Sequence, residues 1–360
     1  MKVSFLVNGL RESAMAERAR GLSQGLGRTY RVEISYRERG KFLSLMRFFS
    51  FLARSDPDLV YVLDIAWAGA VAALLARPFL GFKLIVDTGD LVYELDKLIR
   101  VRTFLGIQCI RLLEKLTLRA ADAIVVRGSF HKLLLKREGY SHVLHIPDGV
   151  DPTLSRPLDV SQLRKELGLD AYLTIGVVGS TIWSERLQMC YGWELIEVLK
   201  LLRDCPVKAI LVGDGTGLNV LKSRASEERV ENGILFVGAV PYGRIPHYVN
   251  LMDICISTQT DNLVGQVRTT GKLPEYLACG RYVLATEVGE AKLILPEEML
   301  VPYHGVKDMS YPRRLAKRIQ SILKNPQVLK EGLKGVDIAR SRFDYRVLGK
   351  RLETLLRAVR

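Results

Sequence analysis

The chain has 360 residues, of which 48% are hydrophobic and 26% are charged, and this composition argues against an intrinsically disordered protein. That length is sufficient for two α/β domains, each with its own core. The net charge of +14 fits nucleic acid, an anionic membrane surface or a phosphorylated substrate as a partner, and it fits simple solubility equally well. The five cysteines are scattered without a CxxC pair, so neither a zinc site nor a disulfide framework is indicated, and we expect buried thiols in a reducing compartment.

Short apolar runs alternate with helical patterns along the chain, which predicts parallel sheets with crossover helices. One set of runs lies in the first half of the chain: 3–7, 59–63, 83–86, 123–126 and 142–146. A second set follows: 173–178, 208–212, 234–237, 254–257 and 282–285. The fold class that we expect is therefore α/β, with two Rossmann-like domains rather than one barrel.

A segment rich in turn formers, residues 146–157, separates the two sets and has no helical period. We place one Rossmann-like domain at residues 1–148, a second at 149–340, and a helix at 341–360 that packs back on the first domain. The first apolar run is too short for a signal peptide, and no window approaches about 18 uninterrupted apolar residues. We therefore expect a cytoplasmic protein without a transmembrane helix.

Two strand ends in the first half carry candidate functional residues. Gly9 follows the run 3–7 and precedes a helix, so it either lets a ligand approach the backbone closely or simply forms a tight turn. Asp90 follows the run 83–86, and polar residues at the carboxyl ends of parallel strands face the crevice where ligands bind. Asp90 could orient an attacking hydroxyl or accept its proton, or it could cap a helix that begins near Leu91.

The stretch 41–53 predicts an apolar-rich helix. Helical spacing places one group of residues on its core face: Phe42, Leu45, Phe49 and Leu52. Phe48 and Phe51 fall outside that stripe, near the basic side chains of Arg47 and Arg54. Exposed aromatic rings beside basic residues suit insertion at a membrane interface, whereas a more fully buried helix is the alternative.

The second half has its own candidate strand ends. Ser180 ends the first strand and could donate a hydrogen bond to phosphate, with Arg186 following within reach of the same crevice. Gly213 permits a tight turn after the next strand, and the backbone near Val240 could contact the edge of a nucleobase. The five histidines show no metal-ligand spacing, and no Gly-x-Ser-x-Gly sequence indicates a hydrolase.

Residues 271–286 predict a loop, a short helix, a turn and a buried strand. Pro274 suits the first turn of a helix, and Gly280 suits its C-terminal cap. Glu275 lies in that first turn, where free N–H groups make an anion site. We expect a nucleotide-sugar to be bound here, with a carboxylate holding a pair of sugar hydroxyls.

The segment 146–343 resembles the C-terminal domain of GT-B glycosyltransferases, most closely family 4, the retaining group 1 enzymes. Residues 146–151 (IPDGVD) resemble the inter-domain IPNGVD segment of that family, and residues 211–215 (LVGDG) and 236–241 (FVGAVP) resemble its next two strand ends. Residues 273–280 (LPEYLACG) with 287–290 (EVGE) resemble its LEAMAxGxPVVAxxxGG region, and 342–344 (RFD) its late Phe-Ser-Trp helix.

The resemblance implies two Rossmann domains facing a central cleft, with an acceptor domain first and a nucleotide-sugar domain second. It implies a set of donor-binding residues: Gly9, Ser180, Arg186, Gly213, Val240, Gln266, Lys272, Glu275 and Gly289. Glu275 would hold the ribose as the second carboxylate of a Glu-x7-Glu motif, and the Val240 backbone would contact the base. Ser180 and Arg186 would contact the diphosphate, with added positive charge from Lys272.

Some positions depart from the family pattern. The first Glu of Glu-x7-Glu falls at Val267, and the neighbouring Gln266 could take its place. Ser180 replaces a usual Arg, so Arg186 must supply more of the charge on the phosphates. Gly89 stands where many members have a His before the residue that matches Asp90.

The function predicted from the resemblance is a retaining glycosyltransferase of hexosyltransferase type that makes cell-surface glycans. It would use a nucleotide-diphosphate sugar, a lipid-linked or polysaccharide acceptor and no metal or other cofactor, with Asp90, Arg186 and Lys272 as catalytic residues. Without a nucleic-acid-binding motif, we expect no nucleic acid partner, and we expect peripheral association with the inner face of an anionic membrane. The alternatives are a catalytically weak nucleotide-sugar binding subunit that partners another transferase, and a sugar-nucleotide epimerase.

Overall fold

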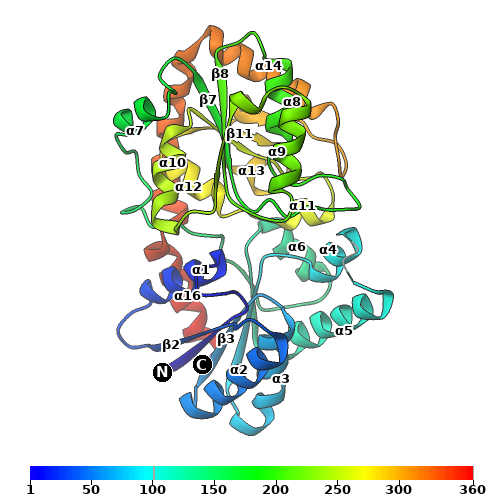
Figure 1. Cartoon of the computed structure of the whole chain (residues 1–360). Helices are drawn as coiled ribbons and strands as arrows, with labels where there is room; N and C mark the ends of the chain where they lie inside the picture. The colour runs from blue at the N-terminus through cyan, green and yellow to red at the C-terminus, as the bar shows by residue number, and fades with distance from the viewer. Residues whose placement is uncertain (100–101, 360) are drawn as a thin grey trace. The chain divides into compact units, whose positions relative to one another are not determined.

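The computed structural model describes residues 1–99 and 102–359 and divides the chain into two compact units (Figure 1). Unit 1 comprises residues 1–149, 266–269 and 342–360, and unit 2 comprises residues 150–265 and 270–341. Each unit contains one six-stranded sheet in which every strand pair is parallel. The predicted α/β class with two Rossmann-like sheets is therefore confirmed.

The strands of unit 1 follow the spatial order β2-β1-β3-β4-β5-β6. Their bounds are β1 Lys2–Val7, β2 Arg31–Tyr36, β3 Leu59–Leu63, β4 Lys83–Thr88, β5 Ala123–Val126 and β6 Val143–His145. The chain adds β2 on one side of β1 and then every later strand on the other side. This reversal makes the β1/β3 boundary the topological switch point of the sheet.

Helices cover both faces of the unit 1 sheet. Their bounds are α1 Ala14–Gln24, α2 Lys41–Ser55, α3 Trp67–Leu80, α4 Val92–Ile99, α5 Phe104–Ala120, α6 Ser129–Arg137 and α16 Tyr345–Val359. One core joins the sheet to α2, α3, α5 and α6, and the other joins it to α1 and α16. The C-terminal helix α16 buries Leu348, Leu352 and Leu356 completely in this second core.

The strands of unit 2 follow the spatial order β12-β11-β10-β7-β8-β9. Their bounds are β7 Leu173–Val178, β8 Val207–Val212, β9 Ile234–Gly238, β10 Ile254–Ser257, β11 Tyr282–Thr286 and β12 Leu300–Val301. The direction in which strands are added reverses between β7 and β10, as in a dinucleotide-binding sheet. The β7/β10 boundary is therefore the switch point of unit 2.

The helices of unit 2 pack in two groups: α8 against α14 and α9, and α12 against α15 and α10. Their bounds are α7 Ser161–Glu166, α8 Trp193–Leu201, α9 Leu218–Glu227, α10 Ile245–Leu251, α12 Lys272–Ala278, α13 Glu290–Ile294, α14 Tyr311–Lys324 and α15 Lys334–Ile338. A short helix, α11 Leu263–Val267, ends in the segment that belongs to unit 1.

The predicted core face of the helix α2 is only partly right. Leu52 is buried and Leu45 packs against the core, as predicted, but Phe42 and Phe49 are exposed. Ser44 and Phe48, which the prediction left off the core face, are buried instead. The sequence pattern favoured a partly wrong stripe because the core face of the helix begins with a polar residue. The Ser44 hydroxyl reaches the carbonyl oxygens of residues 38 and 40, at 3.1 and 2.7 Å, so its burial leaves no hydrogen bond unmade.

The prediction of buried thiols is also wrong at one position. Cys190, Cys255 and Cys279 are buried and Cys205 is half-buried, but Cys109 is exposed on α5.

Candidate functional site

In open parallel sheets, ligands bind outside the carboxyl ends of the strands at the switch point. Two places in this chain meet that description, one in each unit. In unit 2 the chain leaves β7 at Gly179 and leaves β10 at Thr258, and in unit 1 it leaves β1 at Asn8 and β3 at Asp64. Most of the residues predicted from the sequence follow strand ends of one or the other sheet.

Glycines let two turns of unit 2 approach each other closely. Gly179 and Gly213 follow the adjacent strands β7 and β8 and have φ angles of +152° and +137°. A Cβ atom on Gly213 would lie 1.9 Å from the carbonyl oxygen of Gly179, so no larger residue fits there. Ser180, the next residue after Gly179, is exposed, and its hydroxyl lies 3.5 Å from the carbonyl oxygen of Asp214.

The helix α12 is anchored across the end of β7. The Val178 N–H donates to the Tyr276 hydroxyl at 2.7 Å, and that ring is fully buried. Gly280 has a φ of +65° and ends the helix with N–H donation to Leu277, as the sequence predicts. This anchoring places Lys272 and Glu275 in the first turn of α12, beside the carboxyl end of β7.

Lys272 is surrounded by an aromatic ring, a glycine and a buried carboxylate of unit 2. Its ammonium is 3.9 Å from the centroid of the Tyr191 ring, and it would lie 3.2 Å from a Cβ on Gly179. Glu194, from the first turn of α8, is a buried carboxylate that interacts electrostatically with Lys272. Burial raises the pKa of Glu194, and a 2.6 Å hydrogen bond from Thr258 and the charge of Lys272 oppose that rise.

Further polar side-chain atoms of unit 2 are buried without a protein hydrogen-bond partner. Across the described part of the chain, such atoms include the Thr181 hydroxyl, the Trp193 indole N–H and the Gln259 amide nitrogen. Thr181 follows β7, Gln259 follows β10, and all three side chains are buried. Because buried polar groups are normally paired, they are suited to a polar ligand that the protein alone does not supply.

The other predicted donor residues of unit 2 also follow strand ends. Val240 is half-buried after β9, and Gly289 has a φ of +57° where the chain turns from β11 into α13. Arg186 is exposed in the loop after β7. These positions agree with a role at the carboxyl edge, although the described contacts do not bring all of them together.

The remaining predicted donor residues, Gly9 and Gln266, belong to unit 1. A Cβ on Gly9 would lie 2.2 Å from the hydroxyl of Ser13, which caps α1, so the tight-turn interpretation has a direct steric reason. Val267, next to Gln266, is fully buried, and a Cβ on Gly128 would lie 2.5 Å from its carbonyl oxygen.

A buried charge network, which the sequence interpretation missed, lies along the carboxyl edge of the unit 1 sheet. Asp87 is fully buried and accepts hydrogen bonds from Arg18 at 2.8 Å, Tyr61 at 2.6 Å and Arg127 at 3.2 Å. Burial alone would raise the pKa of Asp87, but Arg18 and Arg127 outweigh it and hold the pKa below its usual range.

Asp90 forms an ion pair with Arg268, which lies in the segment 266–269 of unit 1. Arg268 donates from Nε to Oδ1 at 2.7 Å and from Nη2 to Oδ2 at 3.2 Å. The interpretation of Asp90 as a helix cap is wrong, because Glu114 accepts from the first N–H groups of α4, those of Val92 and Tyr93. Burial tends to raise the pKa of Asp90, but Arg268 lowers it below the ordinary value.

Asp64 is held in a left-handed conformation with a φ of +65°. The Asn8 amide donates to the Asp64 carbonyl oxygen at 2.6 Å, and its own oxygen accepts from the Gly69 N–H at 2.8 Å. Arg127 donates to Asp64 Oδ1 at 2.8 Å. Burial raises the pKa of Asp64 to about 6, since the charge of Arg127 only partly compensates.

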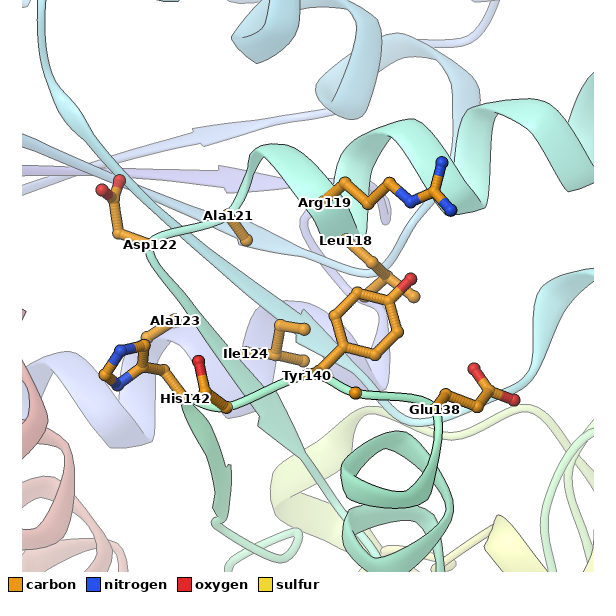
Figure 2. Close-up of a pocket in the computed structure, with 11 residues that line it drawn as sticks. Leu118, Arg119, Ala121, Asp122, Ala123, Ile124, Glu138, Tyr140 and His142 are labelled. Carbon is orange, nitrogen blue, oxygen red and sulfur yellow. The ribbon is translucent and has the colours of Figure 1, made fainter.

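One surface hollow lies at the opposite edge of the unit 1 sheet. Figure 2 shows Tyr140, Arg119 and His142 around it, and its lining includes Ala123 and Ile124 at the amino end of β5 and His142, which precedes β6. Ligand sites of parallel sheets lie at the carboxyl ends, so we do not assign the function to this hollow. Nowhere in residues 1–99 and 102–359 do three His, Cys, Asp or Glu side chains gather as a metal site would require.

Within those same residues, none of the helices combines the length and apolar character needed to cross a membrane.

Comparison with known proteins agrees with this architecture. Residues 2–147 match the glycosyl transferase 4-like domain, and residues 173–325 match the glycosyl transferases group 1 family. No curated protein is significantly similar to the chain.

Solved structures of glycosyltransferases share the fold along nearly the whole chain. Sucrose-phosphate synthase from Thermosynechococcus elongatus is 18% identical with a TM-score of 0.77, covering 100% of this chain and 99% of its own. HepE from Anabaena, solved with UDP-glucose, is 18% identical with a TM-score of 0.78, covering 99% and 100%. A glycosyltransferase from Rickettsia africae is 15% identical with a TM-score of 0.69, covering 99% and 98%.

The protein is therefore an α/β enzyme with the two parallel sheets of GT-B glycosyltransferases. The chain belongs to the group 1 glycosyltransferases of the GT4-like type, as the resemblance predicts. The predictions of the family and of enzymatic activity are thereby confirmed.

Proposed function

We propose that this glycosyltransferase moves a sugar, with retention of configuration, from a nucleotide-diphosphate donor to a lipid-linked or polysaccharide acceptor of cell-surface glycan synthesis. The observation that carries the proposal is the position of Lys272 and Glu275 in one helical turn beside the end of β7. The UDP-glucose complex of HepE supports a UDP-sugar as the first donor to test.

The first turn of α12 and the loop after β7 supply the donor-binding groups. The ammonium of Lys272 and the guanidinium of Arg186 stabilise the negative charge that grows on the leaving diphosphate, and Ser180 donates to it. Glu275 accepts hydrogen bonds from the ribose hydroxyls, and the backbone at Val240 contacts the base. Gly213 and Gly289 keep the turns free of side chains that would obstruct the donor, and contact of Gly9 and Gln266 with the donor stays a prediction.

The transfer breaks the bond between the anomeric carbon and the phosphate oxygen, whose electron pair stays with the diphosphate. The acceptor hydroxyl attacks from the face that the diphosphate leaves, so the configuration is retained. A phosphate oxygen of the leaving group can take the hydroxyl proton, and the mechanism therefore requires neither a metal nor a dedicated protein base. We expect Asp90 to orient the acceptor.

The release of nucleoside diphosphate by a Lys272→Met variant tests this proposal. Nucleoside diphosphate release would be measured with a panel of nucleotide-sugars for the wild type, Lys272→Met and Lys222→Met, a control at an exposed lysine of α9. Loss of one preorganised donor group lowers kcat by about 10²–10³-fold in other enzymes, and we expect a loss of this order for Lys272→Met alone. Equal rates for all three proteins would contradict the role of Lys272.

A second candidate function is a nucleotide-sugar binding subunit that partners another transferase. It is favoured by the fully buried Val267, which stands where the family pattern has a carboxylate. Saturable binding of a nucleotide-sugar without turnover of any donor would establish this alternative and reject the transferase.

The proposed membrane contact lies on α2, α3 and α5, neighbouring helices of unit 1. Their exposed large apolar residues are Phe42, Leu43, Met46, Phe49, Trp67, Leu75, Phe79, Phe104, Leu105, Leu112 and Leu116. The described residues of the other helical layer, α1 and α16, contribute none to this class. The apolar surface is therefore concentrated on one layer of the unit.

The charge of these three helices fits an anionic lipid surface. They carry three basic residues on α2, one on α3 and three on α5, whereas their acidic residue is Glu114, which caps α4. Exposed aromatic rings with surrounding Lys and Arg side chains favour binding to the interface of an anionic bilayer. We propose that this surface brings the enzyme to a lipid-linked acceptor.

Vesicle flotation tests the membrane contact. The protein would float with phosphatidylcholine vesicles that contain phosphatidylglycerol and much less with phosphatidylcholine alone. Absence from both kinds of vesicle would contradict the proposal.

A further inference from the structure

The side chain of Glu194 is a fully buried carboxylate in the first turn of α8. Both of its oxygens accept hydrogen bonds within unit 2. The Thr258 hydroxyl donates to Oε1 at 2.6 Å, and the Gly192 N–H donates to Oε2 at 3.1 Å. Because an ionised carboxylate has acceptors and no donor, these two contacts suit the charged form of Glu194.

The hydrogen bonds extend from Glu194 into the core of unit 2. The hydroxyl of Tyr311, the first residue of α14, lies 3.2 Å from that of Thr258, and both residues are buried. Since Thr258 donates its proton to Glu194, Tyr311 is the donor of this second hydrogen bond. The Tyr311 ring packs edge-on against Tyr303, with the ring centroids 5.0 Å apart. Residues at the end of β10 and the start of α14 therefore hold the carboxylate in place.

Lys272 supplies positive charge to this carboxylate. Its ammonium lies 3.9 Å from the centroid of the Tyr191 ring, and Tyr191 stands shortly before Glu194 in the chain. The short segment 191–194 therefore contributes both an aromatic ring and a carboxylate that attract the same ammonium. A buried carboxylate is stable when hydrogen bonds and an opposite charge compensate the loss of solvent, and Glu194 has both.

We propose that Glu194 is a positioning residue that holds the Lys272 ammonium, together with the Tyr191 ring, where the leaving diphosphate of the nucleotide-sugar gains its negative charge. The inference rests on the proposed function and deepens it, because Glu194 acts through Lys272 and does not itself contact the donor. A lysine has a long flexible stem, so it stabilises a transition state well only when its ammonium is oriented before the charge develops. Glu194 and Tyr191 provide that orientation within unit 2.

The charge of Glu194 allows two roles to be distinguished. A carboxylate near a diphosphate repels it, so removal of that charge alone would strengthen donor binding and speed the reaction. Loss of a positioning residue has the opposite effect, since the Lys272 ammonium is no longer held and the leaving group is stabilised less well. The two roles therefore predict changes of opposite sign in kcat.

The test measures UDP release from UDP-glucose, with water as the acceptor, for the wild type, Glu194→Gln, Lys272→Met and the double variant. Glu194→Gln keeps the shape of the side chain and an oxygen for Thr258 but removes the charge. Residues that orient a metal ligand contribute about 10–100-fold to activity, and we expect kcat to fall by that order here while the donor KM changes little. The control is Glu197→Gln on the same helix, where Glu197 pairs with Arg224 at 2.6 Å, and it should keep the wild-type rate.

The double variant separates positioning from a general loss of structure. We expect Glu194→Gln to cause no further loss in the Lys272→Met background, because its effect passes through the ammonium that is already absent. An equal fold loss in both backgrounds would show a structural role and overturn the inference. A Glu194→Gln variant that is as fast as the wild type, or faster, would overturn it as well.

The outcomes also distinguish this inference from the function on which it rests. A wild type that binds UDP but releases no nucleoside diphosphate from any nucleotide-sugar tested would overturn the proposed function, and this inference with it. An active wild type in which Glu194→Gln has no effect, or the same effect with and without Lys272, would overturn the role of Glu194 alone. If Glu194→Gln does not fold, Thr258→Val removes the hydroxyl that orients the carboxylate, and the same comparison is made in both backgrounds.

Discussion

Arg18 offers the sharpest test of the buried network that holds the carboxyl edge of unit 1. Its guanidinium is 1% exposed and pairs with Asp87 at 2.8 Å. It also donates to the carbonyl oxygens of Ile146 at 2.8 Å and Pro147 at 2.6 Å. The substitution Arg18→Met keeps much of the side-chain volume but removes these three interactions and the ion pair with Asp148 at 3.3 Å. It also leaves Asp87 with less positive charge nearby.

The expected cost follows from these contacts. Breaking a buried ion pair by removing one partner costs about 3–5 kcal/mol, because an uncompensated charge stays buried. The two carbonyl oxygens that lose a donor add to this cost, although Tyr61 and Arg127 still stabilise Asp87. We expect Arg18→Met to lower the free energy of unfolding of unit 1 by about 4 kcal/mol.

Hydrogen exchange measured by mass spectrometry at increasing urea concentrations reports this change for the β4 peptide specifically. The control is Arg20→Met, which removes a partly exposed pair with Glu17 on the same helix and should cost less than about 1 kcal/mol. If Arg18→Met lowered the free energy of unfolding by less than about 1 kcal/mol, as the control is expected to do, our account of the network would be refuted.

Three further predictions follow from single features of the structure. Gly213→Ala should destabilise unit 2 and weaken UDP binding, since its Cβ would clash with the Gly179 carbonyl, whereas Gly243→Ala, with open space around it, should be neutral in calorimetry. The pKa of Asp87 is lower in the folded state than its unfolded value of about 3.9, so ionised Asp87 stabilises the fold above that unfolded pKa. This stabilisation is lost as the pH falls through the lower pKa of the folded state. Asp87→Asn should therefore reduce the dependence of the free energy of unfolding on acid pH, as measured by urea titrations. Phe42→Ser combined with Phe79→Ser, at side chains 72% and 83% exposed, should abolish flotation with anionic vesicles without changing the melting temperature.

A surface control for flotation is available in unit 2, where Leu201 is 44% exposed at the end of α8. Leu201→Ser should leave flotation unchanged. Equal loss of flotation in this variant would show that apolar exposure in general, rather than the α2, α3 and α5 surface, is responsible.

The strands that form the centre of each sheet could be predicted because burial on both faces leaves continuous apolar runs, as in β3 and β7. The edge strand β2 could not, since its sequence RVEISY includes charged residues tolerated on a partly solvated edge. The two-residue strand β12 is too short to give a pattern. Each predicted set of five strands therefore lacked one member of a six-stranded sheet.

The candidate site also contains some residues that the sequence could identify and others that it could not. The helix start at Lys272 and the cap at Gly280 follow from local residue preferences, which the sequence displays directly. Glu194 could not be recognised, because an acidic residue in the first turn of a helix is usually exposed, and here tertiary packing buries it against Thr258. Asp64 directly follows a buried strand, so the reasoning applied to Asp90 could have identified it from the sequence.

A structure with UDP-glucose bound tests the central claim most directly, namely that the donor lies at the carboxyl edge of the unit 2 sheet. Our account predicts the diphosphate within hydrogen-bonding distance of the Lys272 ammonium and the Ser180 hydroxyl, and the ribose hydroxyls on Glu275. A nucleotide bound elsewhere on the protein, with Lys272 and Glu275 not in contact with it, would contradict the account.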